Sequence, residues 1–156
     1  MKKTIFAIIA IGLLTITSCS KNNSNNGNSW TFRTVTYNTT TCTGFSGTLS
    51  ASNVSTSNTT TYGTLTCTFF GTTLPANGGP YTVVSGTPVN STQVAITATT
   101  AGATNSYRST GGNGNNQTVT ISVSNGKVNV NGSGVELVNT SSPADSAALS
   151  VNITQL

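Results

Sequence analysis

The sequence predicts an all-β protein, a single antiparallel β-sandwich or barrel of about nine or ten short strands. From Trp30 onward, apolar residues alternate with Thr, Ser and Asn, which is the period of a strand with one buried face. Turn-forming runs of Gly, Asn and Ser separate these alternating segments. Outside residues 1–18, no segment carries apolar residues at helical spacing, so a helical or mixed fold is not expected.

The first two strands are predicted on either side of a point where the apolar residues change from even to odd positions. Trp30 and Phe32 share one side of an extended chain, whereas Val35 and Tyr37 fall on the other, which indicates a tight turn or bulge at 33–34. The alternation then predicts inward-facing sets in the later strands: Phe45, Gly47, Leu49, Ala51; Leu65, Cys67, Phe69; Tyr81, Val83; Val94, Ile96, Ala98; and Ala147, Leu149, Val151, Ile153. Linkers are expected at 53–58, 76–79, 111–116 and 140–143.

The clearest single element is a β-hairpin that turns at the Asn-Gly dipeptide 125–126. An Asn-Gly pair between two alternating segments is the strongest short-range hairpin signal. A two-residue turn pairs Val123 with Val128 and Ile121 with Val130. This register places all four apolar side chains on one face of the hairpin.

The N-terminus is organised as a secretory leader. Two lysines precede the apolar segment 5–14, which is too short and too early to span a bilayer. The Ile-Thr-Ser-Cys boundary resembles the bacterial lipobox, and this resemblance implies cleavage after residues 1–18 and lipid attachment to the thiol of Cys19. The alternative is an ordinary leader with an unrelated cysteine. Residues 19–29 have no large apolar residue and are predicted to form a flexible Asn/Ser-rich tether, followed by a β-domain at 30–156.

The tether also bears on where the protein resides. Ser20 follows the lipidated cysteine, so the aspartate that retains lipoproteins in the inner membrane of enteric bacteria is absent. Many Bacteroidota lipoproteins reach the cell surface through an acidic run after the cysteine, and this tether contains no Asp or Glu. We therefore expect a lipid-anchored protein of the cell envelope, on the outer membrane, that faces the periplasm rather than the exterior.

Several patterns resemble one type of small Bacteroidota outer-membrane lipoprotein with unassigned biochemical function. They are the short Lys-Lys leader that ends at Ser18-Cys19, the Asn-rich tether, and the segments 30–33, 111–114, 117–120 and 133–137. This resemblance implies an envelope location and a β architecture. It carries over no catalytic or ligand-binding residue.

Charged side chains are few. The leader contributes two of the six cations, so the formal net charge falls from +4 in the whole chain to +2 after its removal. No basic patch is left for nucleic acid, and no His is present. The charged residues of the processed chain are Lys21, Arg33, Arg108, Lys127, Glu136 and Asp145.

The two remaining cysteines, Cys42 and Cys67, form an even pair in an exported chain. Such a pair predicts a disulfide, which would close a loop of about 25 residues and contribute roughly 3 kcal/mol. The alternative is two buried thiols. Because two cysteines without a histidine fall short of a tetrahedral set, neither a metal site nor a cofactor is expected.

The sequence offers little for catalysis. Glu136 lies opposite in parity to its apolar neighbours and Asp145 follows a proline in a loop, so both are predicted to be solvated surface acids. Lys127 adjoins the hairpin turn, where solvation keeps it from serving as a base for a Ser or Thr nucleophile. We therefore predict that the protein is not an enzyme. The Asp-Ser-Ala sequence at 145–147 resembles the O-glycosylation consensus of Bacteroidota, which makes Ser146 a candidate glycan site.

Two functions remain open. The first is a non-catalytic module that binds a ligand, such as a glycan, or another envelope protein, and Trp30, Tyr62, Tyr81 and Tyr107 are its candidate glycan-contacting residues. The second is a structural or assembly subunit of the envelope with no small-molecule ligand. An exposed aromatic patch would favour binding, and a long unpaired apolar edge strand would favour assembly.

Overall fold

The computed structural model describes residues 27–53, 62–100, 105–111 and 117–156, so the predicted leader and Cys19 lie outside the described residues. The described part contains eleven strands and no helix, and thus no helix long and apolar enough to cross a membrane. The predicted all-β class is confirmed, with one or two strands more than expected. The strands are β1 Ser29–Phe32, β2 Val35–Asn38, β3 Thr41–Phe45, β4 Thr48–Asn53, β5 Gly63–Phe69, β6 Gly79–Val84, β7 Gln93–Thr100, β8 Asn105–Ser109, β9 Thr118–Ser124, β10 Lys127–Asn139 and β11 Ser146–Thr154.

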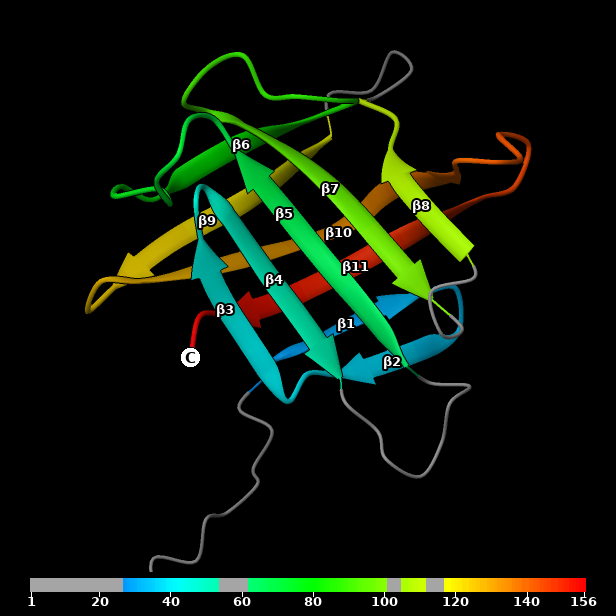
Figure 1. Cartoon of the computed structure of the whole chain (residues 1–156), viewed down its shortest axis with the longest axis horizontal. Helices are drawn as coiled ribbons and strands as arrows, with labels where there is room; N and C mark the ends of the chain where they lie inside the picture. The colour runs from blue at the N-terminus through cyan, green and yellow to red at the C-terminus, as the bar shows by residue number, and fades with distance from the viewer. Residues whose placement is uncertain (1–26, 54–61, 101–104, 112–116) are drawn as a thin grey trace, which may run out of the picture.

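The strands form one continuous sheet that closes on itself. Its order is β2-β1-β11-β10-β9-β6-β7-β5-β4-β3, and β8 closes a small barrel by pairing with both β10 and β7. All pairs are antiparallel except β6–β7. In Figure 1, strands β3, β4, β5, β7 and β8 form a front layer, and β1, β2, β9, β10 and β11 run behind it in a crossing direction. We call these the front sheet and the back sheet.

Barrel closure depends on β7, because β6 and β8 both pair with the same edge of this strand. β5 pairs with one edge of β7 along its length, so β6 and β8 must divide the other edge between them. Ser109 lies at their junction and is buried. Its hydroxyl accepts a hydrogen bond from the Ile96 amide at 3.1 Å and donates one to the Val84 carbonyl at 2.6 Å. This side chain satisfies backbone groups for which the sheet supplies no partner at that point.

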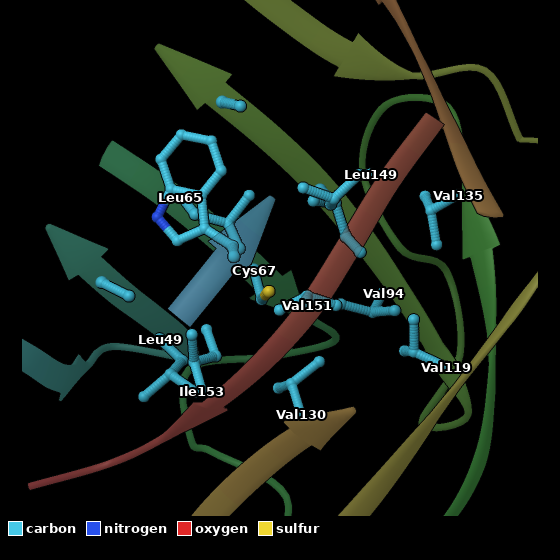
Figure 2. Close-up of a cluster of buried hydrophobic side chains, with 14 of the residues drawn as sticks. Leu49, Leu65, Cys67, Val94, Val119, Val130, Val135, Leu149, Val151 and Ile153 are labelled. Carbon is cyan, nitrogen blue, oxygen red and sulfur yellow. The ribbon is translucent and has the colours of Figure 1, made fainter. Parts of the chain in front are cut away.

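One apolar core fills the space between the two sheets. Alternate residues of the strands face inward, except that a β-bulge between Gly132 and Val135 shifts the alternation on β10. Trp30 and Tyr37 stack in this core at 3.8 Å between ring centroids. Figure 2 shows side chains from both layers meeting in the interior: Leu49, Leu65, Cys67, Val94, Val119, Val130, Val135, Leu149, Val151 and Ile153. The predicted inward sets on β5, β6 and β7 are confirmed, as is the turn between β1 and β2.

The predicted Asn-Gly hairpin is confirmed in register. Val123 pairs with Val128, and Ile121 pairs with Val130. The prediction for Phe45 is wrong, because β3 ends there and Phe45 is 84% exposed. A second two-residue turn, at Ser46 and Gly47, separates it from the inward set of β4.

The folded domain begins slightly before the predicted boundary. Asn28 is buried, and its side-chain amide donates to the Thr154 carbonyl at 3.0 Å while its oxygen accepts from the Thr154 amide. Its own carbonyl accepts hydrogen bonds from the amide and hydroxyl of Thr39, each at 2.9 Å. The chain therefore joins the barrel beside the last strand.

The predicted Cys42–Cys67 disulfide is absent, and both residues are buried free thiols. Cys42 lies on β3 and Cys67 on β5, with β4 between them. Two strand spacings amount to about 9.6 Å, beyond the roughly 7 Å that a disulfide allows between Cα atoms. Burial raises the pKa of Cys42 to about 11 and that of Cys67 to about 12, so both thiols stay protonated at neutral pH.

Candidate functional site

A groove of about 510 Å³ opens at the end of the barrel where β5 ends and β6 begins. One wall is the connection from β5 to β6, residues 70–78, and the other is the turn that leads into β7. The residues that line it are Phe69, Phe70, Thr73, Leu74, Pro75, Ala76, Asn77, Gly78, Gly79, Pro80, Tyr81, Ser91 and Thr92.

The first wall, which we call the groove loop (residues 70–78), rests directly on the strands. A Cβ at Gly47 would overlap the carbonyl oxygen of Gly71, and one at Gly78 would lie 2.9 Å from the carbonyl oxygen of Ile121. Glycine at these two positions lets the loop backbone approach β4 at one end and β9 at the other. In the middle of the loop, Leu74 packs against the core. The wall is therefore fixed by packing at three points.

The second wall is fixed by hydrogen bonds. The side-chain oxygen of Asn90 accepts from the Thr92 amide at 3.1 Å and from the Thr92 hydroxyl at 3.0 Å. The Thr92 carbonyl in turn accepts from the Thr82 amide of β6 at 2.8 Å, and the side-chain oxygen of Gln93 accepts from the Val89 amide at 2.8 Å. An Asx-type turn thus holds this wall in place.

The groove lining combines aromatic rings with uncharged polar groups. Phe69 and Tyr81 meet edge to face at 5.9 Å between centroids at its base, and Phe70 is 50% exposed beside it. Thr73 and Asn77 also line the groove, and their side chains have no protein hydrogen-bond partner among the described residues. The lining contains no carboxylate, amine, guanidinium or thiol. It can pack against an apolar face and exchange hydrogen bonds, but it offers no acid–base pair or nucleophile with a base.

The four aromatic residues predicted from sequence do not gather at one site. Trp30 and Tyr107 are buried in the core, and Tyr62 is partly exposed but does not line the groove. Only Tyr81 contributes to it. Sequence reasoning missed Phe70, although adjacent aromatics at the end of an alternating strand require one of the two to point outward.

Asp145 lies in the loop before β11 with its side chain 37% exposed, as predicted, but the sequence did not reveal that its carboxylate is paired. Its carboxylate forms an ion pair with Arg33, and it accepts hydrogen bonds from the Asn139 amide at 3.2 Å and the Tyr107 hydroxyl at 3.3 Å. The hydrogen bond from Asn139 is the largest cause that lowers the pKa of Asp145, followed by the positive charge of Arg33. The Arg33 guanidinium also lies 5.7 Å from the Phe32 ring centroid and 5.5 Å from that of Tyr107. This cluster joins the β1–β2 turn to the loop before β11.

The other predicted site residues stay apart. Glu136 is partly exposed on β10 and pairs with Ala148, and its carboxylate has no protein partner within the described part of the chain. Lys127 and Ser146 are exposed, the latter at the first position of β11. The structure therefore does not join Glu136 and Asp145 in one hydrogen-bonded site.

Within the described ranges, no three residues of the types His, Cys, Asp and Glu lie close enough together to hold a metal ion. No protein-family model, curated protein or solved structure matches the chain. The groove and its surroundings are thus interpreted from their own chemistry.

Proposed function

We propose that this chain is a lipid-anchored protein of the cell envelope whose β-domain is a non-catalytic binding module, and that its ligand occupies the groove. The observation that carries this proposal is a preformed groove with an exposed aromatic ring and unpartnered polar groups. Because both walls are held by packing and hydrogen bonds, little conformational entropy is lost when a ligand binds. The lining has no charged group and no base beside its hydroxyls, which supports binding rather than catalysis.

The alternative role, a structural or assembly subunit, has less support. Strands β2 and β3 end the sheet order, with four and five residues respectively. The outer edge of β3 also receives the Leu156 amide, which donates to the Cys42 carbonyl at 2.9 Å. Short edge strands offer few backbone groups for pairing with another chain.

The binding proposal is tested by capture from the native envelope. Wild type, Phe70→Ala and Val89→Ala are immobilised, and retained material is analysed for protein, lipid and glycan. Val89 is the matched control because it is apolar and 74% exposed but does not line the groove. We expect the same material on wild type and Val89→Ala and its loss on Phe70→Ala. If nothing retained depends on Phe70, the groove is not a binding site.

The anchor is tested separately at Cys19. We expect Cys19→Ser to abolish metabolic labelling with a fatty acid and to move the protein to the soluble or uncleaved fraction, because two or more acyl chains are what hold a lipoprotein firmly. A Cys19→Ser protein that still partitions with membranes like wild type would remove the lipobox interpretation.

A further inference from the structure

The outer face of the front sheet is covered by hydroxyl side chains. Inward positions on β3, β4, β5, β7 and β8 are mostly apolar and buried, so the alternate positions point outward. Their pairing aligns hydroxyls in rows across the strands, and we call this set the hydroxyl face: Thr41, Thr43, Thr48, Ser50, Ser52, Thr64, Thr66, Thr68, Thr97, Thr99 and Ser106.

The rows follow from the register alone. Thr41 pairs with Ser52, which pairs with Thr64, then Thr99 and then Ser106. A second row lies two residues further along each strand. Neighbouring hydroxyls in a row are therefore about 4.8 Å apart, and rows are about 6.7 Å apart.

Most of these hydroxyls are free to bind a ligand. The hydroxyls of Thr41 and Ser52 bond to each other at 2.8 Å, and the rest of the hydroxyl face makes no protein side-chain hydrogen bond within the described ranges. The back sheet differs, because the Asn129 amide there donates to the Asn152 oxygen at 3.1 Å and the Thr154 hydroxyl at 2.8 Å. Some polar groups of the back sheet thus already satisfy one another, centred on Asn129.

Two exposed aromatic rings border the hydroxyl face where it meets the groove. Phe45 pairs with Thr48, and Thr48 pairs with Thr68, so Phe45 lies at the end of that row. Phe70 follows two residues after Thr68 and is 50% exposed, against 84% for Phe45. Two strand spacings and an offset of two residues along β5 separate the backbones of Phe45 and Phe70 by roughly 12 Å. Since Phe70 also lines the groove, the groove and the hydroxyl face are continuous.

A second pocket lies on the other side of Thr68 from the groove. This pocket of about 240 Å³ lies over β5, β7 and β8, and Thr68, Thr97 and Arg108 are among its lining residues. An extended ligand that leaves the groove across Phe70 and Thr68 reaches this pocket directly. Arg108 is the only charged residue among the two sets of lining residues and the hydroxyl face.

We infer that the ligand of this site is an uncharged glycan chain, which lies in the groove and extends across Phe70 onto Phe45 and the hydroxyl face. This inference rests on the proposed binding function and names its ligand class. A sugar ring presents C–H groups that pack on aromatic faces and hydroxyls that both donate and accept hydrogen bonds, as Thr and Ser do. Each feature of the surface thus has a counterpart in the ligand.

Other ligand classes fit this surface less well. A polyanion would find one guanidinium and no other positive charge there. A purely apolar partner would strip water from the unpartnered hydroxyls without replacing their hydrogen bonds. Binding to ice would require a flat array of hydroxyls. Neighbouring strands are rotated by roughly 20–25° relative to one another, so the hydroxyl face is twisted and does not match a flat lattice. A flexible glycan can follow that twist.

The test is a binding assay with the detergent-solubilised full-length protein. The probes are insoluble cellulose, chitin and starch, with alginate as the anionic comparison, and the variants are Phe45→Ala, Phe70→Ala and Thr66→Val. Thr66 lies in the middle of the hydroxyl face, and its matched control is Thr120→Val, an exposed threonine on β9 of the back sheet. Thermal unfolding of each variant checks that it folds.

We expect binding to at least one neutral polysaccharide. Each Phe variant should weaken it about three- to tenfold, as loss of an aromatic contact does. Thr66→Val should weaken it about two- to threefold through loss of one hydrogen bond, and Thr120→Val should leave it unchanged.

The glycan inference is overturned if no neutral polysaccharide binds, if only alginate binds, or if the Phe variants bind as wild type does. Its failure is distinguishable from failure of the proposed function. Phe70-dependent capture of a protein or lipid from the envelope would leave the binding module standing and replace only the ligand class. If capture does not depend on Phe70 either, both proposals fail together.

Discussion

The β3–β4 and β9–β10 hairpins turn through nearly the same backbone conformations in different surroundings. Ser46 and Gly47 have φ values of 48° and 72°, and Asn125 and Gly126 have 52° and 74°. Positive φ at both central positions marks a type I′ turn in each. A Cβ at Gly126 would meet nothing within 4 Å, whereas one at Gly47 would overlap the backbone of the groove loop.

This difference separates two reasons for a glycine in a turn. Gly126 serves the local conformation only, and its hairpin ends in solvent. Gly47 serves the same conformation and also lets residues 70–78 lie on the turn, which shapes the groove. The same local signal therefore marks a simple reversal in one hairpin and part of a binding site in the other.

The largest expected effect comes from the matched pair Gly47→Ala and Gly126→Ala. Both variants place a Cβ at positive φ, which costs about 1–2 kcal/mol. Gly47→Ala must also displace the groove loop, at about 1–3 kcal/mol for overpacking. We therefore expect the free energy of unfolding to fall by about 2–5 kcal/mol for Gly47→Ala and about 1–2 kcal/mol for Gly126→Ala, measured by chemical denaturation.

The same two variants also distinguish an effect on stability from an effect on ligand binding in the groove. Gly47→Ala should weaken ligand capture in material that remains folded, and Gly126→Ala should not. Equal losses of stability and unchanged capture in both variants would mean that the close approach of Gly47 to Gly71 plays no part in shaping the groove.

A second contrast concerns buried ionisable groups, which the front sheet contains and the β9–β10 hairpin lacks. Burial raises the pKa of Cys42 to about 11 and that of Cys67 to about 12, above about 8.5 in an unfolded chain. Because the unfolded state releases these protons first, stability is full below about pH 8.5 and falls as the pH rises through that value. By about pH 9.5 the expected loss is about 1.4 kcal/mol per thiol.

The measurement is chemical denaturation at neutral and alkaline pH under non-oxidising conditions. The doubly substituted Cys42→Ala/Cys67→Ala protein should lose most of this alkaline dependence. Native wild type should resist alkylation near pH 8, and two thiols should react once it is denatured. A single linked pair in the non-reduced protein would contradict the buried-thiol geometry.

These contrasts show which parts of the structure the sequence determines locally. The Asn-Gly hairpin was predicted to the register because its turn residues and the alternation on both strands agree. The Ser-Gly hairpin was missed because Phe45 matches the parity of Leu49 and Ala51 when the turn between them is not counted. A two-residue turn moves the inward set from even positions in β3, where Cys42 is buried, to odd positions in β4, and a single alternation continued through the turn puts Phe45 on the wrong face.

The candidate site was harder to predict than the fold, for a different reason. Its walls come together only when Gly71 lies on Gly47 and Gly78 lies on Ile121, and these contacts depend on the sheet order. The sheet order also prevents the predicted disulfide, because it places a strand between the two cysteines. The even number of cysteines, which suggested the disulfide, carries no information about that strand. The polar groups of the groove are consistent with the composition, because a chain with so few charges leaves hydroxyls and amides as its polar groups.

The β1–β2 turn gives a third, weaker case, in which an arginine occupies the positive-φ position. Arg33 has φ of 59° and is held by Asp145, whose pKa is lowered by the Asn139 hydrogen bond and by Arg33 itself. A lowered pKa means that the contribution to stability is present above the unfolded value of about 3.9 and is lost as the pH falls below it. We expect Asp145→Asn to be slightly less stable than wild type at neutral pH, with a smaller loss on acidification.

Denaturation curves between about pH 3 and pH 6 provide the comparison, and Glu136→Gln is the control because its carboxylate makes no ion pair or hydrogen bond within the described ranges. The control should retain the wild-type acid dependence. If Asp145→Asn and Glu136→Gln behave alike, the ion pair does not hold the β1–β2 turn.

The smallest effect on stability is expected at the residue that precedes the turn in each hairpin. Phe45 precedes the turn of the first hairpin, and Ser124 holds the same place in the second. Phe45→Ser makes the first resemble the second, and at 84% exposure the ring has little buried area to lose. The free energy of unfolding should therefore change by no more than about 0.5 kcal/mol. Phe45 is part of the proposed glycan site, so the same variant should lose affinity for a neutral polysaccharide while its unfolding curve overlays that of wild type. A clear loss of stability in Phe45→Ser would show instead that the ring packs within the protein, and the contrast between the two hairpins would then extend no further than Gly47.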